Sequence, residues 1–243
     1  MKKLSILVTF LLAVTSCLYA SLEENFILVS DSEVVHSFGV GLDDRVTPCS
    51  TFKVALCLMG FDSNILLSDE APIWNFQEGY SEYLPSWKAP QTPRSWITYS
   101  CLWYSQLIAE QLGMEKIQGY LRDFDYGNQD MSGGLTTAWL SSSLKISPKE
   151  QVHFIRKMLD GSLPVSHHSL QTTKELLFLE ELPNSWKLFG KTGFDRLEND
   201  LEVRWLVGWV EKEGAVYPFA YNVQGEKTDR EQAISRVKQL LGL

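Results

Sequence analysis

The chain has 243 residues and a formal net charge of −8, with 44% hydrophobic and 12% aromatic residues. This composition is typical of a folded globular protein and excludes a disordered chain. The acidic balance, without any run rich in lysine and arginine, argues against binding to nucleic acid or to an anionic membrane surface.

Residues 1–20 have the pattern of a secretory signal peptide. Lys2 and Lys3 precede an apolar stretch at 4–14 that is too short to span a bilayer, and Ala20 is a plausible cleavage residue. An alternative is a lipoprotein signal acylated at Cys17. We favour cleavage after Ala20, because the apolar run continues smoothly up to it.

Cleavage would leave a mature chain of residues 21–243 with a net charge of −10, since Lys2 and Lys3 are removed. No other apolar stretch reaches the length of a membrane span. We therefore expect a single exported domain in the periplasm.

Strand patterns lie at both ends of the mature chain, and helical patterns lie between them. Strands are predicted at 26–30, 34–40, 186–191, 202–211 and 215–222. Helices are predicted at 50–59, 104–112, 114–122, 148–159, 169–175 and 230–241. Residues 69–96 are rich in proline and tryptophan and predict an irregular connection. This order indicates an α/β protein of the α+β type, with an antiparallel sheet built from both chain termini and an inserted helical region.

Ser50 and Lys53 stand at the start of a predicted apolar helix and, three residues apart, share one helix face. A serine hydroxyl is a poor nucleophile until a base takes its proton. Lysine can be that base only when it is neutral or chemically modified, and apolar surroundings favour the neutral amine. A Ser-x-x-Lys pair alone is more often a helix cap with an exposed lysine, so its weight depends on other motifs.

Four further motifs follow in a fixed order. They are Ser100-Cys101-Leu102, Tyr126-Gly127-Asn128, the run from Trp139 to Pro148, and Lys191-Thr192-Gly193. Class A β-lactamases and penicillin-binding proteins carry Ser-x-x-Lys, Ser-Asp-Asn and Lys-Thr-Gly, and this chain has no Ser-Asp-Asn. From about residue 40 to its end, it instead resembles the class D, oxacillinase-type serine β-lactamases.

The resemblance implies the serine β-lactamase/transpeptidase fold, with Ser50 at the head of a central helix and Lys191 on the facing strand. It also implies hydrolysis of penicillin- and oxacillin-type β-lactams through an acyl-enzyme on Ser50. Lys53 would carry CO₂ as a carbamate and act as general base in acylation and deacylation, with Trp139 donating a hydrogen bond to it. That carbamate would be the only added group, because the histidines show no metal-ligand spacing.

The remaining roles also follow from the resemblance. Ser100 would relay a proton to the leaving nitrogen, Lys191 would supply positive charge, and Arg230 would bind the substrate carboxylate. The backbone N–H groups of Ser50 and Phe194 would form the oxyanion hole. The substrate would also meet Thr192, Gly193 and Leu102.

Two departures from the family pattern bear on substrate range. Leu102 stands where the middle motif often has valine, and a highly charged loop at 194–200 follows the Lys-Thr-Gly motif. Tyr126-Gly127-Asn128 either shapes the cleft wall or is a simple turn. Small β-lactams are the expected partners, and a homodimer is left open.

The main alternative is a penicillin-binding sensor or D,D-peptidase that acylates but deacylates slowly. A catalytically inactive binding module is disfavoured, because every polar group that the mechanism needs is present. The state of Cys49, Cys57 and Cys101 is open, although an odd number leaves at least one free thiol.

Overall fold

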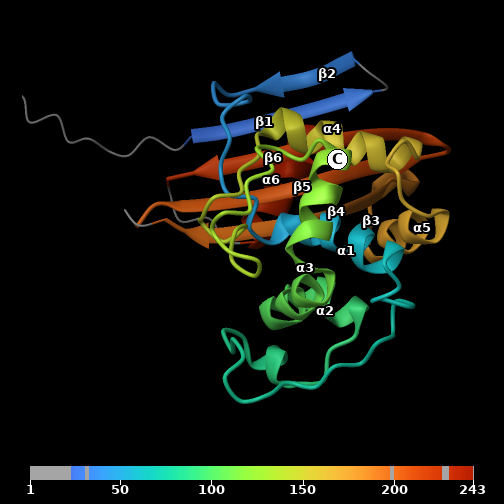
Figure 1. Ribbon diagram of the computed structural model, residues 1–243. Helices are drawn as coiled ribbons and strands as arrows, with labels where there is room; N and C mark the ends of the chain where they lie inside the picture. Colours follow the sequence, from blue (N-terminus) through green and yellow to red (C-terminus); the bar gives the residue numbers. More distant parts are fainter. Residues whose placement is uncertain (1–22, 31–32, 198–199, 226–229, 243) are drawn as a thin grey trace, which may run out of the picture.

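The computed structural model describes residues 23–30, 33–197, 200–225 and 230–242 (Figure 1). The predicted signal peptide at 1–20, with Ala20 and Cys17, lies outside these ranges. Two residues of the charged loop, 198–199, also lie outside them.

The strands form one antiparallel sheet in the order β2-β1-β6-β5-β4-β3. They are β1 (Glu23–Ser30), β2 (Glu33–Phe38), β3 (Phe178–Glu181), β4 (Lys187–Arg196), β5 (Glu202–Lys212) and β6 (Ala215–Gln224). Because N-terminal β1 pairs with C-terminal β6, the two ends of the chain build the sheet together, as predicted.

The helices are α1 (Lys53–Asp62), α2 (Pro93–Tyr99), α3 (Leu102–Phe124), α4 (Pro148–Asp160), α5 (His167–Leu176) and α6 (Arg230–Leu241). Three short 3₁₀ helices are η1 (Cys49–Phe52), η2 (Pro85–Lys88) and η3 (Pro183–Ser185). Gly113 interrupts α3 with a left-handed φ of 75°, which accounts for the two helices predicted there.

The sheet separates two apolar layers. On one face, Ala233 and Val237 of α6 pack against side chains such as Phe26 and Leu206. On the other face, Trp205 of β5 packs near Cys49 of η1 and Val152 of α4. Helices α2 and α3 and the connection at 69–96 extend away from this second face (Figure 1).

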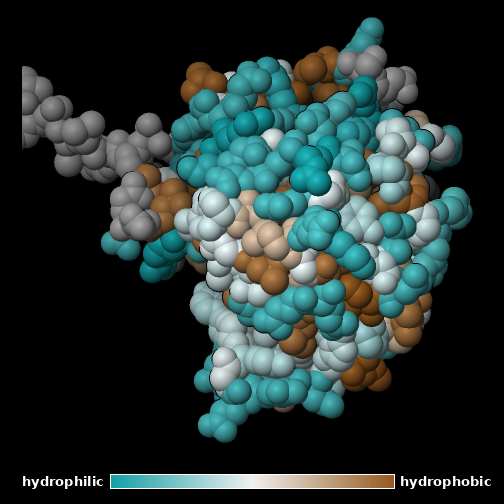
Figure 2. Space-filling view, in the orientation of Figure 1, coloured by the Kyte–Doolittle hydropathy of each residue, from teal (hydrophilic) through white to brown (hydrophobic). Residues whose placement is uncertain are grey.

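Helix α1 forms the centre of the helical part. Every residue from Lys53 to Phe61 is buried, so no face of this helix meets solvent. An apolar helix with this pattern is stable only inside a core. The outer surface in the same view is mostly hydrophilic, with apolar areas over the edge strand β2 (Figure 2). Among the described residues, no helix has the length and apolar character needed to cross a membrane.

Several predicted boundaries were wrong. The helix predicted from residue 50 begins at Lys53, because Cys49–Phe52 forms η1, and the strand predicted to reach residue 40 ends at Phe38. The edge strand β3 was not predicted.

The connection at 69–96 contains the start of α2, where Pro93 occupies the first turn and Thr92 and Ser95 form a reciprocal capping box. Strand β4 does not end at Lys191 but continues to Arg196, because it pairs with β5 along its whole length. The Lys-Thr-Gly motif therefore lies inside a strand.

Candidate active site

Ser50 lies in the tight turn η1 that leads into α1. The preceding residue, Cys49, has a left-handed φ of 52°, a conformation that a non-glycine residue adopts only at some cost. This turn leaves Ser50 partly exposed while Lys53 is only 1% exposed. The Lys53 Nζ lies 3.4 Å from Ser50 Oγ, at the long end of hydrogen bonding.

Lys53 is held in an apolar pocket. Burial lowers the pKa of its amine to about 8, and the thiols of Cys101, Cys57 and Cys49 lie near it. Burial raises the pKa of all three thiols, so they are neutral at pH 7. All three cysteines are free. With a pKa of about 8, about one amine in ten is neutral at pH 7, compared with fewer than about one in a thousand for an ordinary lysine.

Trp139 is buried against Phe52, the residue that precedes Lys53. Its ring is 1% exposed and lies 5.2 Å, centroid to centroid, from the ring of Phe52. Its carbonyl oxygen accepts hydrogen bonds from the Cys49 N–H at 3.1 Å and from Thr47 Oγ1 at 2.9 Å. The turn that carries Trp139 is thus attached to the turn that carries the nucleophile.

Ser100 lies at a sharp corner between α2 and α3. It ends α2 in a left-handed conformation with φ 53°. The Trp87 indole N–H donates to the Tyr99 carbonyl at 2.9 Å, and this hydrogen bond holds the residue before Ser100 in place. Lys191 Nζ donates to Ser100 Oγ at 2.5 Å, so the corner meets the sheet at this point.

Strand β4 joins the parts of the site through one of its faces. Side chains two residues apart on a strand point the same way, and Lys191, Gly193 and Asp195 share the face toward η1. Lys191 contacts Ser100, and Asp195 Oδ2 accepts from Ser141 Oγ at 2.6 Å. Between them, a Cβ on Gly193 would lie 3.0 Å from the Pro48 carbonyl, so a larger residue here would require the nucleophile turn to shift by a few tenths of an ångström.

Lys191, in the middle of β4, carries the second buried amine of the site. The pKa of the Lys191 amine is well below its usual value because of burial, and the charges of Lys53 and Arg230 lower it further. Lys191 also donates to the Thr192 carbonyl at 3.0 Å. Arg230 is the exposed first residue of α6.

Three other predicted site residues border this cluster. The Phe194 ring lies under the guanidinium of Arg204, 4.1 Å from its centre, so this side chain is held in place on β4. Thr192 is partly buried. Leu102, at the start of α3, is partly buried against the core that contains Phe52.

The Tyr126-Gly127-Asn128 triplet forms a turn. The Asn128 side chain donates to the Ser143 carbonyl at 2.8 Å and accepts from the Lys145 N–H at 2.9 Å. A Cβ on Gly127 would lie 2.1 Å from the Lys145 carbonyl. The triplet therefore anchors the chain that follows Trp139, which favours the turn interpretation.

A buried polar contact under the nucleophile was missing from the sequence interpretation. Gln151 of α4 donates to Thr51 Oγ1 at 2.8 Å, and Thr51 Oγ1 donates to the Pro48 carbonyl at 2.6 Å. Both side chains are buried. Thr47, Ser141 and Asp195 were also missed. Only the folded chain brings these residues together, because Gln151 is 100 residues from Thr51, Ser141 is 94 residues from Thr47, and Asp195 is 54 residues from Ser141.

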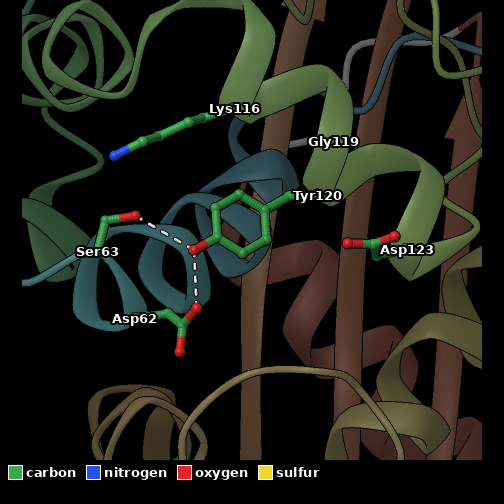
Figure 3. A pocket seen from close by; sticks show the side chains of 6 residues that line it. All are labelled: Asp62, Ser63, Lys116, Gly119, Tyr120 and Asp123. Atoms are coloured by element: carbon green, nitrogen blue, oxygen red, sulfur yellow. Dashed lines mark hydrogen bonds between the residues drawn. The ribbon is translucent and has the colours of Figure 1, made fainter.

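A surface cavity of about 360 Å³ lies at the other end of α1, away from Ser50. Tyr120 is at its centre, donating to Asp62 at 2.7 Å and lying 3.2 Å from Ser63 Oγ, with Lys116 and Asp123 on opposite sides (Figure 3). Its central polar groups bind one another. Within the described ranges, no cluster of His, Cys, Asp and Glu could hold a metal ion.

Comparisons with known proteins match this geometry. Residues 33–241 match the family model for the penicillin binding protein transpeptidase domain. The chain is 39% identical to Beta-lactamase OXA-1 of Escherichia coli over 87% of its own length and 80% of that protein. It is also 34% identical to Regulatory protein BlaR1 of Bacillus licheniformis, over 75% of this chain but 30% of BlaR1.

Among solved structures, the OXA-427 class D β-lactamase superposes with a TM-score of 0.83 at 36% sequence identity. The superposition covers 90% of this chain and 98% of that one. The chain therefore belongs to the penicillin-binding-protein transpeptidase family and, within it, to the class D serine β-lactamases, which are hydrolases.

Proposed function

We propose that this protein hydrolyses β-lactam antibiotics through an acyl-enzyme on Ser50, with carboxylated Lys53 as the general base. The observation that carries the proposal is the buried Lys53 amine, 3.4 Å from Ser50 Oγ and with a pKa lowered to about 8. A neutral amine at this place can react with CO₂ and can reach the serine proton.

Carboxylation converts the lysine into an anionic base. The neutral Lys53 amine attacks the carbon of CO₂, an N–C bond forms, and one proton leaves to solvent. The resulting carbamate is anionic and can accept a proton, which a lysine ammonium cannot do. Low pH reverses the reaction, because protonating the amine removes the form that binds CO₂.

Acylation would begin when the carbamate takes the Ser50 hydroxyl proton. Ser50 Oγ then attacks the lactam carbonyl carbon, and the negative charge on its oxygen is stabilised by the backbone N–H groups of Ser50 and Phe194. When the intermediate collapses, the lactam C–N bond breaks. Ser100, hydrogen-bonded to Lys191, passes its proton to the departing nitrogen and is reprotonated by the proton that the carbamate took from Ser50, so the carbamate is anionic again before deacylation.

Deacylation would use the same base a second time. The carbamate removes a proton from a water molecule, the resulting hydroxide attacks the ester carbon, and the bond to Ser50 Oγ breaks. Ser50 recovers its proton and the opened product, a penicilloic acid in the case of penicillins, leaves. Trp139 would serve both steps, because its buried ring packs on Phe52, the residue next to Lys53, and would help to keep bulk water from the carbamate.

The substrate would lie along β4. Its carboxylate would meet Lys191 and the positive charge of Arg230, whose planar guanidinium is well suited to binding a carboxylate. Thr192 and Gly193 would provide the strand edge beside it. Leu102 would border the site from the start of α3 and, because it is larger than valine, would restrict the space near Lys53.

A slowly deacylating penicillin sensor is the second candidate, favoured by the similarity to BlaR1. Turnover of a chromogenic cephalosporin separates the two. We expect many turnovers per protein molecule. A single burst equal to the protein concentration would identify a sensor or D,D-peptidase, and no reaction would indicate an inactive binding module.

We further propose that residues 1–20 direct export to the periplasm and that 21–243 is the mature catalytic domain. The basic and apolar pattern of the N-terminus supports this. N-terminal sequencing of the protein from a periplasmic fraction should begin at Ser21. A chain that keeps residue 1, or a lipid-modified Cys17, would contradict the proposal.

A further inference from the structure

A set of contacts outside the assigned motifs holds the Trp139 turn in place. Thr47 is its centre, with a side chain that is 4% exposed. Its hydroxyl donates to the Trp139 carbonyl at 2.9 Å and accepts from the Ser141 N–H at 3.0 Å. The Ser141 hydroxyl in turn donates to Asp195 of β4 at 2.6 Å.

These contacts connect three separate parts of the site. Thr47 precedes the nucleophile turn, Ser141 follows Trp139, and Asp195 lies on the face of β4 that also carries Lys191. Thr47 is itself fixed, because the Trp205 indole of β5 donates to its carbonyl at 2.9 Å. Ser141 has a left-handed φ of 44°, so the turn keeps an unfavourable conformation that its contacts must maintain.

We propose that Thr47, Ser141 and Asp195 are positioning residues that set how tightly Lys53 keeps its carbamate. The inference rests on the proposed carbamate chemistry and extends it to residues that never touch the substrate. Their contacts fix the backbone of Trp139, and the Trp139 ring packs on Phe52, the residue next to Lys53. Loosening the turn lets the ring move and opens the pocket to water, which favours the free ammonium over the carbamate.

The test measures carbamate occupancy without substrate. Wild-type protein is titrated with ¹³C-labelled bicarbonate at fixed pH, and the carbamate signal is followed by NMR. Thr47→Val keeps the shape of the side chain but removes its hydroxyl. We expect half-occupancy to need about three to ten times more bicarbonate, the effect of losing one or two hydrogen bonds. Thr47→Ser restores the hydroxyl and should return to the wild-type value.

Asp195→Ala is an independent variant, at the half-exposed acceptor of the Ser141 hydroxyl. It removes the acceptor of the Ser141 hydroxyl and should shift half-occupancy in the same direction by about two- to fivefold. Asp195→Asn keeps an acceptor oxygen and should shift it less. Ser142→Ala, one residue further along the same turn, is the matched control and should bind bicarbonate like the wild type.

The outcomes separate this inference from the proposed mechanism. No carbamate signal in the wild type would refute the carboxylated lysine itself. A wild-type signal together with unchanged half-occupancy in both Thr47→Val and Asp195→Ala would overturn the inference and leave the mechanism in place. If Thr47→Val does not fold, the Asp195 and Ser142 variants decide the question.

Discussion

Both ends of helix α1 carry polar side chains, but the hydrogen bonding of these side chains differs between the two ends. At the C-terminal end, Asp62 accepts hydrogen bonds from the Tyr120 hydroxyl and from the Ser166 N–H, each at 2.7 Å (Figure 3). At the N-terminal end, the buried Lys53 amine has Ser50 Oγ at 3.4 Å and three neutral thiols around it. The partly exposed Asp62 carboxylate therefore has short hydrogen bonds, whereas the buried Lys53 amine has one long hydrogen bond and no oppositely charged partner among the described residues.

This difference shows how the fold keeps a reactive group. A buried charge without good partners is costly, and the protein lowers that cost by shifting the pKa of the group. The same shift makes Lys53 reactive toward CO₂. At the C-terminal end, short hydrogen bonds stabilise the fold, and none of the groups there is poised for chemistry.

The largest expected effect comes from removing the nucleophile. Ser50→Ala should lower the rate of penicillin hydrolysis by at least about a thousandfold, because no other group can form the acyl-enzyme. Ser63→Ala, at the opposite end of α1, is the matched control and should keep wild-type activity. Steady-state rates, with circular dichroism to verify folding, test both. A Ser50→Ala variant that turns over at a near-normal rate would refute the assignment.

Lys53→Met should abolish turnover and stabilise the fold. Burial lowers the pKa of Lys53 from 10.5 to about 8. Below pH 8 the lysine is therefore charged in both states, and its burial destabilises the native state relative to the unfolded state. In CO₂-free buffer at pH 7, the free energy of unfolding should rise by on the order of 3 kcal/mol. The free energy of unfolding of the wild type should rise between about pH 8 and pH 10.5, as the buried amine loses its proton. The stability difference between Lys53→Met and the wild type should therefore shrink.

Urea unfolding of both proteins at pH 7 and pH 10 measures the difference in their free energies of unfolding. The comparison between the two ends of α1 would fail if Lys53→Met were no more stable than the wild type at pH 7. It would also fail if the gap were the same at both pH values.

Substitutions of the two basic residues near the site, Lys191 and Arg230, should affect different kinetic constants. Lys191→Ala should lower kcat by about a hundredfold, because Ser100 loses its hydrogen-bonded partner during proton transfer. Arg230→Ala should chiefly raise KM, by about tenfold, because an exposed guanidinium contributes mainly to binding the carboxylate. Steady-state kinetics of both variants should reveal this split. Small, equal effects would show that neither residue faces the substrate.

The smallest effect is expected at the C-terminal end of α1. Tyr120→Phe removes one hydrogen-bond donor from Asp62 and should lower the free energy of unfolding by about 1 kcal/mol. Hydrolysis should be unchanged, since the cavity is separated from Ser50 by the length of the helix. A marked loss of activity would mean that this end of α1 is coupled to the site.

Much of this arrangement was predictable from local sequence patterns. The order of terminal strands and internal helices predicted the sheet apart from its edge strand β3, and the spacing of Ser50 and Lys53 predicted their contact. These features depend on near neighbours or on a motif, and a single sequence shows them directly.

Other features depend on long-range contacts that no local pattern contains. The Thr47 hydroxyl meets the backbone of Trp139, 92 residues later, so nothing around Thr47 predicts its partner. Asp195 was missed because the strand was expected to end at Lys191. Had β4 been extended by four residues, the alternation of Lys191, Gly193 and Asp195 would have placed all three on one face.

The most direct test of the carboxylated Lys53 mechanism is the time course of protein mass after mixing with a penicillin, at high bicarbonate and in CO₂-depleted buffer. With bicarbonate, we predict that the acyl-enzyme mass appears and then disappears as Ser50 is released. Without CO₂, the acyl form should accumulate slowly and persist, and added bicarbonate should clear it. Identical time courses in the two buffers would contradict the carbamate and leave Lys53 as an ordinary amine base.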